Sequence, residues 1–228
     1  MQKMNFSKLS VFRNHNIGVY IFSNNKFALV PNGISHGSKK VVEETLGVDA
    51  IETTIMDTRI IGVLVSGNDR AILLPYAVKS EEIDRLKESI GGSVKIGIID
   101  SKFTALGNYI TANNKFAYIS PLLEDEIARK ISDLLDVKVS KKSYLGISII
   151  GSIIVSNDYV AFVHPMLSDS DASEIKNDMK VEVVQTTVNE GVPFVKSGIV
   201  ANNNGVLVGS ATTGTEILNI TSLLNQEI

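Results

Sequence analysis

The 228-residue chain contains no cysteine, which excludes disulfide bonds, thiolate metal sites and a cysteine nucleophile. Histidine is also scarce. His15, His36 and His164 are too few and too scattered to indicate a structural zinc site. The charges nearly balance, with 22 basic residues against 25 acidic ones and a net charge of −3. Such a chain attracts nucleic acid poorly, since neutralising phosphates takes many cations. We therefore expect no metal, no cofactor and no binding to DNA.

Long hydrophobic runs are absent as well. The most apolar stretch, residues 144–155, is uncharged but short and is interrupted by glycine and serine, whereas a membrane span needs roughly 20 apolar residues. Residues 1–12 lack an apolar core of signal-peptide length. The composition, 44% hydrophobic and 21% charged, excludes a disordered chain. We expect a cytoplasmic protein that does not contact a membrane.

The sequence does contain one pattern that occurs five times. In each copy a glycine opens an apolar run, a polar turn rich in asparagine interrupts it, and a second apolar run follows. The second run ends at proline in the first four copies. The opening glycines are Gly18, Gly62, Gly107, Gly151 and Gly198, at intervals of 44, 45, 44 and 47 residues. Unrelated apolar segments would not keep such a spacing, so the chain is predicted to consist of five repeats.

Each repeat predicts a β-hairpin followed by a helix and a further strand. Asparagine and aspartate suit the hairpin turns because they tolerate left-handed backbone angles. Apolar stripes at helical spacing, such as Ile83, Leu86 and Ile90, predict the helices. The strands after the first four helices are predicted at residues 48–55, 94–99, 137–140 and 181–188.

The fifth repeat ends at its helix, and we expect residues 8–12 to supply the strand that it lacks. This pairing closes the array into a ring and removes open sheet edges, which promote aggregation. Residues 1–228 then form a single ring domain. The repeats are predicted at residues 13–56, 57–101, 102–145, 146–192 and 193–228. The predicted fold class is α/β, a five-fold pseudosymmetric α/β propeller closed by the N-terminal strand.

Five such units resemble the pentein fold, which is used by enzymes acting on guanidino groups and by translation initiation factor 6 of archaea and eukaryotes. The local motifs resemble the second group. They are Arg59-Ile60-Ile61-Gly62, Ala105-Leu106-Gly107-Asn108, Asn157-Asp158-Tyr159-Val160-Ala161 and Thr187-Val188-Asn189-x-Gly191. Each motif is weak alone, but their order on the repeat grid is specific and covers essentially the whole chain.

The resemblance implies a protein that binds the large ribosomal subunit on the face that meets the small subunit. Members of this family touch a ribosomal protein near the sarcin–ricin loop, block subunit joining and take part in large-subunit maturation. A charge near zero fits a protein partner with ribosomal RNA contacts at the rim. The chain stops soon after its fifth helix, so it resembles the archaeal form, which lacks the eukaryotic C-terminal tail. We expect a monomer when it is free.

The alternative is a pentein-like enzyme that acts on guanidino compounds by a non-cysteine mechanism. Pentein enzymes that work by covalent catalysis use a cysteine nucleophile, which this chain lacks. The segment Gly209–Gly214 has the glycine spacing of a phosphate loop but not its lysine. His164 occupies a position that holds valine, leucine and serine in other repeats, which favours packing over chemistry. We expect no enzymatic activity, and a purely structural or oligomerisation module is a third, weaker interpretation.

Residues that break the repeat symmetry are the candidates for recognising a single asymmetric partner. The position after the opening glycine varies, with Val19, Val63, Asn108, Ser152 and Ile199 in the five repeats, and its variety suggests five ring-related points on one face. Arg59 adds a guanidinium suited to forked hydrogen bonds, and Asn68 and Asn189 add amides on adjoining loops. The predicted ribosome-binding residues are therefore Arg59, Val63, Asn68, Asn108, Ser152, Asn189 and Ile199. The alternative for each is a turn residue satisfied by its own backbone.

Overall fold

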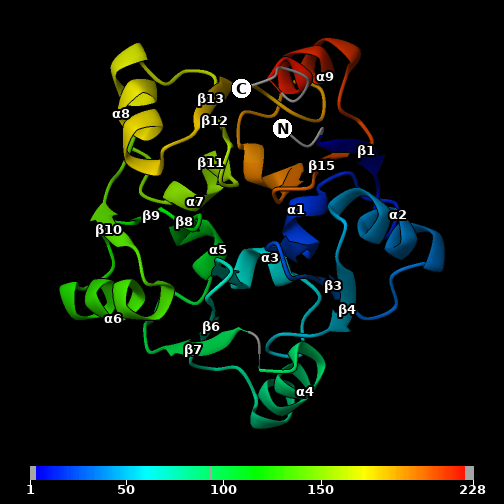
Figure 1. The fold of residues 1–228 in the computed structure, drawn as a ribbon, viewed down its shortest axis with the longest axis vertical. Coiled ribbons are helices and arrows are strands. Elements are labelled where there is room, and N and C mark those ends of the chain that lie inside the picture. Colours follow the sequence, from blue (N-terminus) through cyan, green and yellow to red (C-terminus); the bar gives the residue numbers. More distant parts are fainter. Residues whose placement is uncertain (1–3, 93, 224–228) are drawn as a thin grey trace.

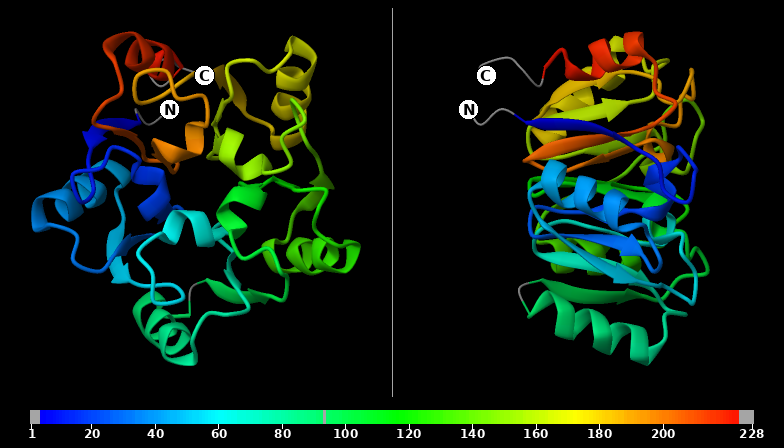
Figure 2. Two further views of the ribbon diagram at one scale, coloured as in Figure 1. Left: turned by 180° about the vertical axis from the view of Figure 1, so that it is seen from behind. Right: turned by 90° about the vertical axis from the view of Figure 1, so that its right-hand side faces the viewer.

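Five blades surround one central axis in the computed structural model, which describes residues 4–92 and 94–223 (Figure 1). Each blade holds one three-stranded sheet, so the described residues form five such sheets. The strands and the longer helices run along the ring axis (Figure 2). This arrangement confirms the predicted α/β propeller with five-fold pseudosymmetry, the pentein fold.

The first blade shows the order of elements. A short helix near the axis, α1 (Ile17–Tyr20), leads into the antiparallel strands β2 (Phe22–Ser23) and β3 (Phe27–Pro31). The outer helix α2 (His36–Leu46) follows, and β4 (Asp49–Thr53) returns to pair in parallel with β3. The predicted sequence of hairpin, helix and strand is thus present, preceded by a helical turn.

Three further blades repeat this order. The second has α3 (Ile61–Leu64), β5 (Ser66–Gly67), β6 (Ala71–Pro75), α4 (Ser80–Ile90) and β7 (Lys95–Ile99). The third has α5 (Leu106–Tyr109), β8 (Ile110–Ala112), β9 (Phe116–Ile119), α6 (Asp125–Leu135) and β10 (Lys138–Lys141). The fourth has α7 (Ile150–Ile153), β11 (Ile154–Ser156), β12 (Val160–Val163), α8 (Asp169–Met179) and β13 (Glu182–Gln185).

The fifth blade joins the two ends of the chain. It contains the 3₁₀ helix η1 (Val195–Ser197), β14 (Ile199–Ala201), β15 (Gly205–Gly209) and α9 (Gly214–Thr221). Its third strand is β1 (Asn5–Leu9), which pairs in parallel with β15, so the predicted closure is confirmed. The strand lies three residues earlier than the predicted segment 8–12, because Val11 and Asn14 already bridge a tight turn. Residues 224–228 of the predicted fifth repeat lie outside the described residues.

The first four opening glycines lie in the short inner helices and Gly198 directly follows η1, so the prediction that they begin strands was wrong. A Cβ atom on Gly62 would lie 2.1 Å from the carbonyl oxygen of Gly18. A Cβ on Gly107 would lie 2.1 Å from the Gly62 oxygen, and one on Gly151 2.4 Å from the Gly107 oxygen. Glycine is therefore required where the backbones of neighbouring blades meet at the axis.

The fifth blade has a lysine at this position. The first turn asparagines, Asn24, Asn68, Asn113, Asn157 and Asn202, lie six residues after the first four glycines and after Lys196. The carbonyl oxygen of Lys196 is also the atom that a Cβ on Gly18 would meet, at 1.8 Å. Lys196 is therefore the counterpart of Gly18, and the assignment of Gly198 to this position was two residues out.

The first turn asparagines form a closed ring of hydrogen bonds. Each side-chain amide donates to the backbone carbonyl of the corresponding asparagine in the next blade, at 2.8–3.2 Å, and Asn202 returns to Asn24. Each side-chain oxygen also accepts backbone N–H groups of its own turn, as Asn113 does from Lys115 and Phe116. The asparagines therefore fix their turns and also join all five blades.

A second ring occupies the next turn position. Its members are Asn25, Asp69, Asn114, Asp158 and Asn203, and each backbone N–H donates to the side chain of the next member at 2.7–3.1 Å. The amide of Asn114 also donates to both carboxylates, at 2.6 Å to Asp69 and 2.8 Å to Asp158. The two acidic groups near the axis are thus held by asparagine amides.

The apolar cores lie between neighbouring blades. Leu29 of β3, Ile72 of β6 and Leu86 of α4 belong to one buried cluster, although they come from two blades. Since each blade depends on its neighbour for burial, closure of the ring completes the core. Within residues 4–92 and 94–223, no helix is both long and apolar enough to cross a membrane.

Candidate binding surface

The two ends of the ring carry different groups. We call one end the turn face, formed by the hairpin turns at residues 24–26, 68–70, 113–115, 157–159 and 202–204. We call the other the helix face, formed by the inner helices and the loops that lead into them. The polar rings close the turn face, so their asparagines are engaged within the protein. The exposed groups of the turn face are instead the third turn residues, such as Arg70 and Tyr159.

Three of the predicted binding residues lie exposed or partly exposed on the helix face. Arg59 is exposed on the loop before α3, and its guanidinium lies 5.0 Å from the centre of the Phe12 ring. Val63 of α3 and Asn108 of α5 are partly exposed at equivalent positions of neighbouring blades. The structure therefore brings Arg59, Val63 and Asn108 to one end of the ring.

Two other predicted residues on this side are engaged inside the protein. Ser152 of α7 is buried, and its hydroxyl donates to the carbonyl of Ile149 at 2.7 Å. Asn189 is buried in a tight turn with a left-handed φ of 50°, and its amide donates to the carbonyl of His15 at 3.0 Å. Both fit the alternative of a turn residue satisfied by the backbone.

The last two predicted residues do not belong to this surface. Asn68 is buried on the turn face as a member of the first asparagine ring. Ile199 is fully buried in β14, because the two-residue shift at Lys196 places Ser197 where Ile199 was expected. These two placements are corrections, since neither side chain is available on the surface predicted for it.

Exposed apolar side chains surround the helix face, and the sequence patterns did not reveal them. Phe12, Ile60, Leu145 and Phe194 lie in the loops before the inner helices, with 38–47% of their surface exposed. Tyr76, Leu122 and Met166 directly follow the closing prolines and are exposed as well. The sequence feature that could have revealed them is a large apolar residue directly after the proline that ends a buried strand.

His164 has the packing role that its variable position predicted. It is buried, its ring lies edge-on to Phe194 with 6.0 Å between the ring centroids, and its Nδ1 atom accepts the backbone N–H of Met166. Burial lowers the pKa of His164, which favours the neutral ring. The buried His164 ring therefore packs against the exposed Phe194 ring.

Two buried glutamates hold the loops that lead into the helix face. Glu82 accepts hydrogen bonds from the Thr54 hydroxyl and from the backbone N–H groups of Met56 and Asp57. These bonds fix the tight turn that precedes Arg59, in which Met56 and Asp57 have positive φ angles. Glu82 is therefore a positioning residue for Arg59.

Glu216 plays the same part for the turn at residues 189–191. It completes the capping box with Thr213 and accepts bonds from the Thr187 hydroxyl and the Gly191 N–H. Burial alone would raise the pKa of Glu216, but the hydrogen bonds from Thr213, Thr187 and Gly191 outweigh it and lower the pKa to about 2. The stability that the carboxylate contributes is present above its unfolded pKa of about 4.3 and is lost as pH falls towards 2.

Replacing Glu216 with glutamine should lower the free energy of unfolding at pH 7 by about 2 kcal/mol, because charged hydrogen bonds are replaced. We expect the difference from the wild type to shrink between pH 4.3 and pH 2, where the wild-type carboxylate also becomes neutral. Urea unfolding at pH 7 and pH 3 measures it. Glu88→Gln, on the exposed side of α4, is the control. A difference from the wild type that is the same at both pH values would contradict the prediction.

The family model of the eIF-6 family matches residues 6–223 of this chain. The chain belongs to the eIF-6 family. A translation initiation factor 6 from Staphylothermus marinus is 45% identical over 218 residues, covering 95% of this chain and 96% of that protein. One from Nitrosopumilus maritimus is 47% identical over 218 residues, covering 96% and 98%. The eIF-6 relatives therefore match almost the entire ring, including both faces.

Solved structures of enzymes show a more distant likeness to this eIF-6 family member. A dimethylarginine dimethylaminohydrolase adduct with S-methyl-L-thiocitrulline aligns with a TM-score of 0.47 and 12% identity, covering 75% of this chain and 68% of that one. A likeness at this level carries no argument about activity. The function is therefore inferred from the family and from the helix face.

Proposed function

We propose that this protein binds the large ribosomal subunit at the face that meets the small subunit and so prevents the two subunits from joining. Membership of the eIF-6 family over residues 6–223 carries this proposal. The protein is a cytoplasmic monomer when free, it also takes part in large-subunit biogenesis, and it acts by occupying a surface rather than by catalysis. Its main partner is a ribosomal protein near the sarcin–ricin loop, with ribosomal RNA contacted at the rim.

The helix face is the proposed contact surface. It combines the exposed guanidinium of Arg59 with the partly exposed Val63 and Asn108, and it has apolar neighbours such as Phe12 and Ile60. The ring has 9817 Å² of accessible surface. A standard interface takes about 800 Å² from each partner, so one end of the ring can supply it. Exposed aromatic and arginine side chains are also the groups that dominate interface energies.

Changing Arg59 to glutamate should weaken binding to isolated large subunits at least about tenfold, because an exposed cation of the proposed contact surface becomes an anion. The change should leave the fold intact, since Arg59 is exposed. Co-sedimentation with purified large subunits in sucrose gradients measures the binding, and the wild type should be absent from joined ribosomes. We expect Asn108→Glu to act in the same direction.

Lys138→Glu is the matched control for Arg59→Glu. Lys138 is also an exposed cation near a phenylalanine ring, 6.0 Å from the centre of Phe116, but it begins β10 near the turn face. Its variant should bind like the wild type. If Arg59→Glu and Asn108→Glu both co-sediment like the wild type, the helix face is not the contact surface. If the wild type itself stays at the top of the gradient with excess subunits at low salt, the proposed function is wrong.

The alternative function, a pentein-like enzyme using a non-cysteine mechanism, requires acidic groups and a histidine that converge on the axis. Asp69 and Asp158 lie there, but they are bound by asparagine amides. Of the described residues that line the two axial cavities, none is a histidine. Turnover of arginine-like compounds by the purified protein would revive this alternative.

A further inference from the structure

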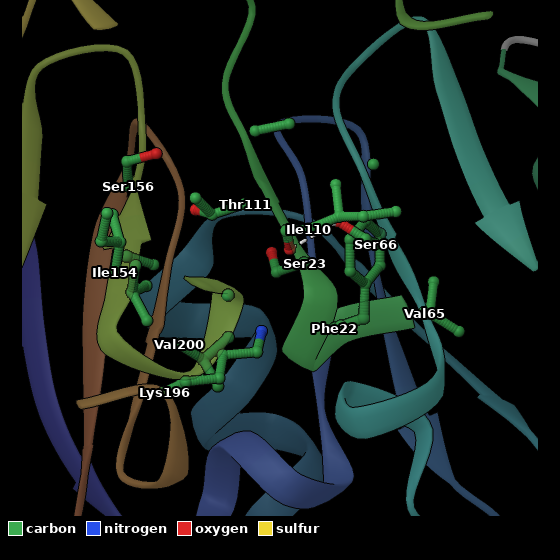
Figure 3. Close-up of a pocket in the computed structure, with 16 residues that line it drawn as sticks. Phe22, Ser23, Val65, Ser66, Ile110, Thr111, Ile154, Ser156, Lys196 and Val200 are labelled. Carbon is green, nitrogen blue, oxygen red and sulfur yellow. Dashed lines mark hydrogen bonds between the residues drawn. The ribbon is translucent and has the colours of Figure 1, made fainter. Parts of the chain in front are cut away.

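A small cavity lies on the ring axis between the inner helices and the asparagine turns (Figure 3). Its volume is about 50 Å³, and all five blades contribute to its wall. One water needs about 10–15 Å³, whereas sites for organic ligands begin near about 300 Å³. The cavity therefore has room for a few waters or one small inorganic ion, and not for a nucleotide or an amino acid.

Lys196 is the one charged residue among the described residues that line this cavity. Its side chain enters because η1 carries lysine where the other four inner helices carry glycine. Figure 3 shows the amine pointing into the cavity. In the described part of the chain, the ammonium group has no hydrogen-bond acceptor and no carboxylate partner. A cation that is partly removed from water without a counter-charge is unfavourable.

The environment of Lys196 disfavours the charged form of its amine. Lys196 is half-buried, and desolvation by the surrounding protein lowers the pKa of its amine to about 8. At neutral pH most of the amine is still charged. An anion beside it would offset the cost of burying that charge.

The cavity wall supplies further donors. The hydroxyl of Ser156 is buried and has no hydrogen-bond partner among the described residues. Thr111 also lines the cavity, and its hydroxyl adds a second donor. The hydroxyls of Ser23 and Ser66 line it as well, but they donate to the carbonyls of Asn24 and Ile110. Hydroxyl groups donate readily to anions, directly or through a water.

Acidic groups do not compete at this position. The nearest ones along the axis, Asp69 and Asp158, line the neighbouring cavity beside the asparagine ring and accept amide hydrogen bonds there. No other Asp or Glu lines either axial cavity among the described residues. The axis therefore has a negative end at the turn face and a positive group at the level of the inner helices.

We propose that the central cavity binds one small monovalent inorganic anion, of halide size, with the ammonium group of Lys196 as its charge partner and the hydroxyls of Ser156 and Thr111 as further donors. The site joins residues of several blades, so the bound ion stabilises the closed ring. Nothing in this proposal depends on the ribosomal role.

Bromide is the probe. We expect crystals of the full chain grown with bromide to give an anomalous peak beside the Lys196 amine. In solution, Tm should rise with bromide at constant ionic strength, balanced with gluconate, which is too large for the cavity. The apparent Kd for bromide should be at least tenfold lower in the wild type than in Lys196→Met, which keeps the side-chain length without the charge. Stabilisation follows mass action, so Tm reports occupancy.

The pH dependence gives a second measurement that needs no variant. The bromide effect on the wild type should be larger at pH 7 than at pH 9.5, because the amine loses its charge above about 8. Ser156→Ala should weaken the effect less than Lys196→Met does. An anomalous map with only water at the amine, or an equal bromide response in the wild type and Lys196→Met, would overturn the proposal. An equal response at both pH values would do the same.

Discussion

Replacing Gly62 with alanine is expected to destabilise the ring by more than about 4 kcal/mol, the range that marks a severe packing fault. The added Cβ would lie 2.1 Å from the carbonyl oxygen of Gly18 and 2.5 Å from that of Ile21. Both atoms belong to the backbone of the neighbouring blade, so no flexible side chain can move aside. Relief requires the two blades to separate at the axis, where the same contact recurs at Gly107 and Gly151.

Gly37→Ala is the matched control. Gly37 lies in the outer helix α2, and a Cβ there would meet no atom within 4 Å. Because alanine favours helix more than glycine does, this change should stabilise the protein by up to about 1 kcal/mol. Guanidinium unfolding of the two variants and the wild type measures the contrast. A Gly62→Ala variant within 1 kcal/mol of the wild type would show that the axis tolerates separation.

The repeat spacing predicted the architecture because each blade packs the same elements, one outer helix and one three-stranded sheet, in the same order. Outer helices such as α4 must bury one apolar stripe, and Leu86 and Ile90 of that stripe are buried as the helical spacing indicated. The missing fifth strand predicted closure, since an unpaired sheet edge is unfavourable and β1 pairs with β15. These features follow from the local spacing of apolar residues and from the number of predicted strands, and both can be read from a single sequence.

The inner helices could not be predicted in this way. A short run such as residues 17–22 contains no charged or amide side chain, so its pattern does not distinguish a strand from a helical turn. The backbone contact that requires Gly18 involves Lys196, which is 178 residues away. The spacing of the glycines suggested Gly198 as the fifth member of the series. The spacing of the turn asparagines is more regular and identifies Lys196 as the residue equivalent to Gly18.

The candidate surface was predicted only in part because exposure depends on which end of a blade a residue occupies. Arg59 and Asn108 lie at the helix face, whereas Asn68 lies at the other end of its hairpin and is buried. Turn chemistry explained why asparagine suits these positions, but it did not reveal that each amide also reaches the next blade. Contacts between residues 44 or 45 positions apart become visible only once neighbouring blades are packed together.

Replacing Asn113 with alanine should therefore cost about 3–5 kcal/mol, far more than the loss of a turn residue. The Asn113 side chain donates to the carbonyls of Asn157 and Met179, at 3.1 and 3.0 Å, and accepts the N–H groups of Lys115 and Phe116, both at 2.9 Å. Each of these four bonds is worth about 0.5–1.5 kcal/mol, and their partners would be left unpaired in a buried region.

Asn113→Asp separates the two halves of this role. Aspartate keeps the acceptor for the turn N–H groups but places a carboxylate oxygen against the carbonyls of Asn157 and Met179. If the amide joins the blades, aspartate should be about as harmful as alanine, whereas a residue that only shapes its turn would tolerate aspartate well. Asn177→Asp, on the exposed side of α8, is the control and should change the free energy of unfolding by less than about 0.5 kcal/mol. A stable Asn113→Asp variant would mean that the asparagine rings shape the turns without holding the blades together.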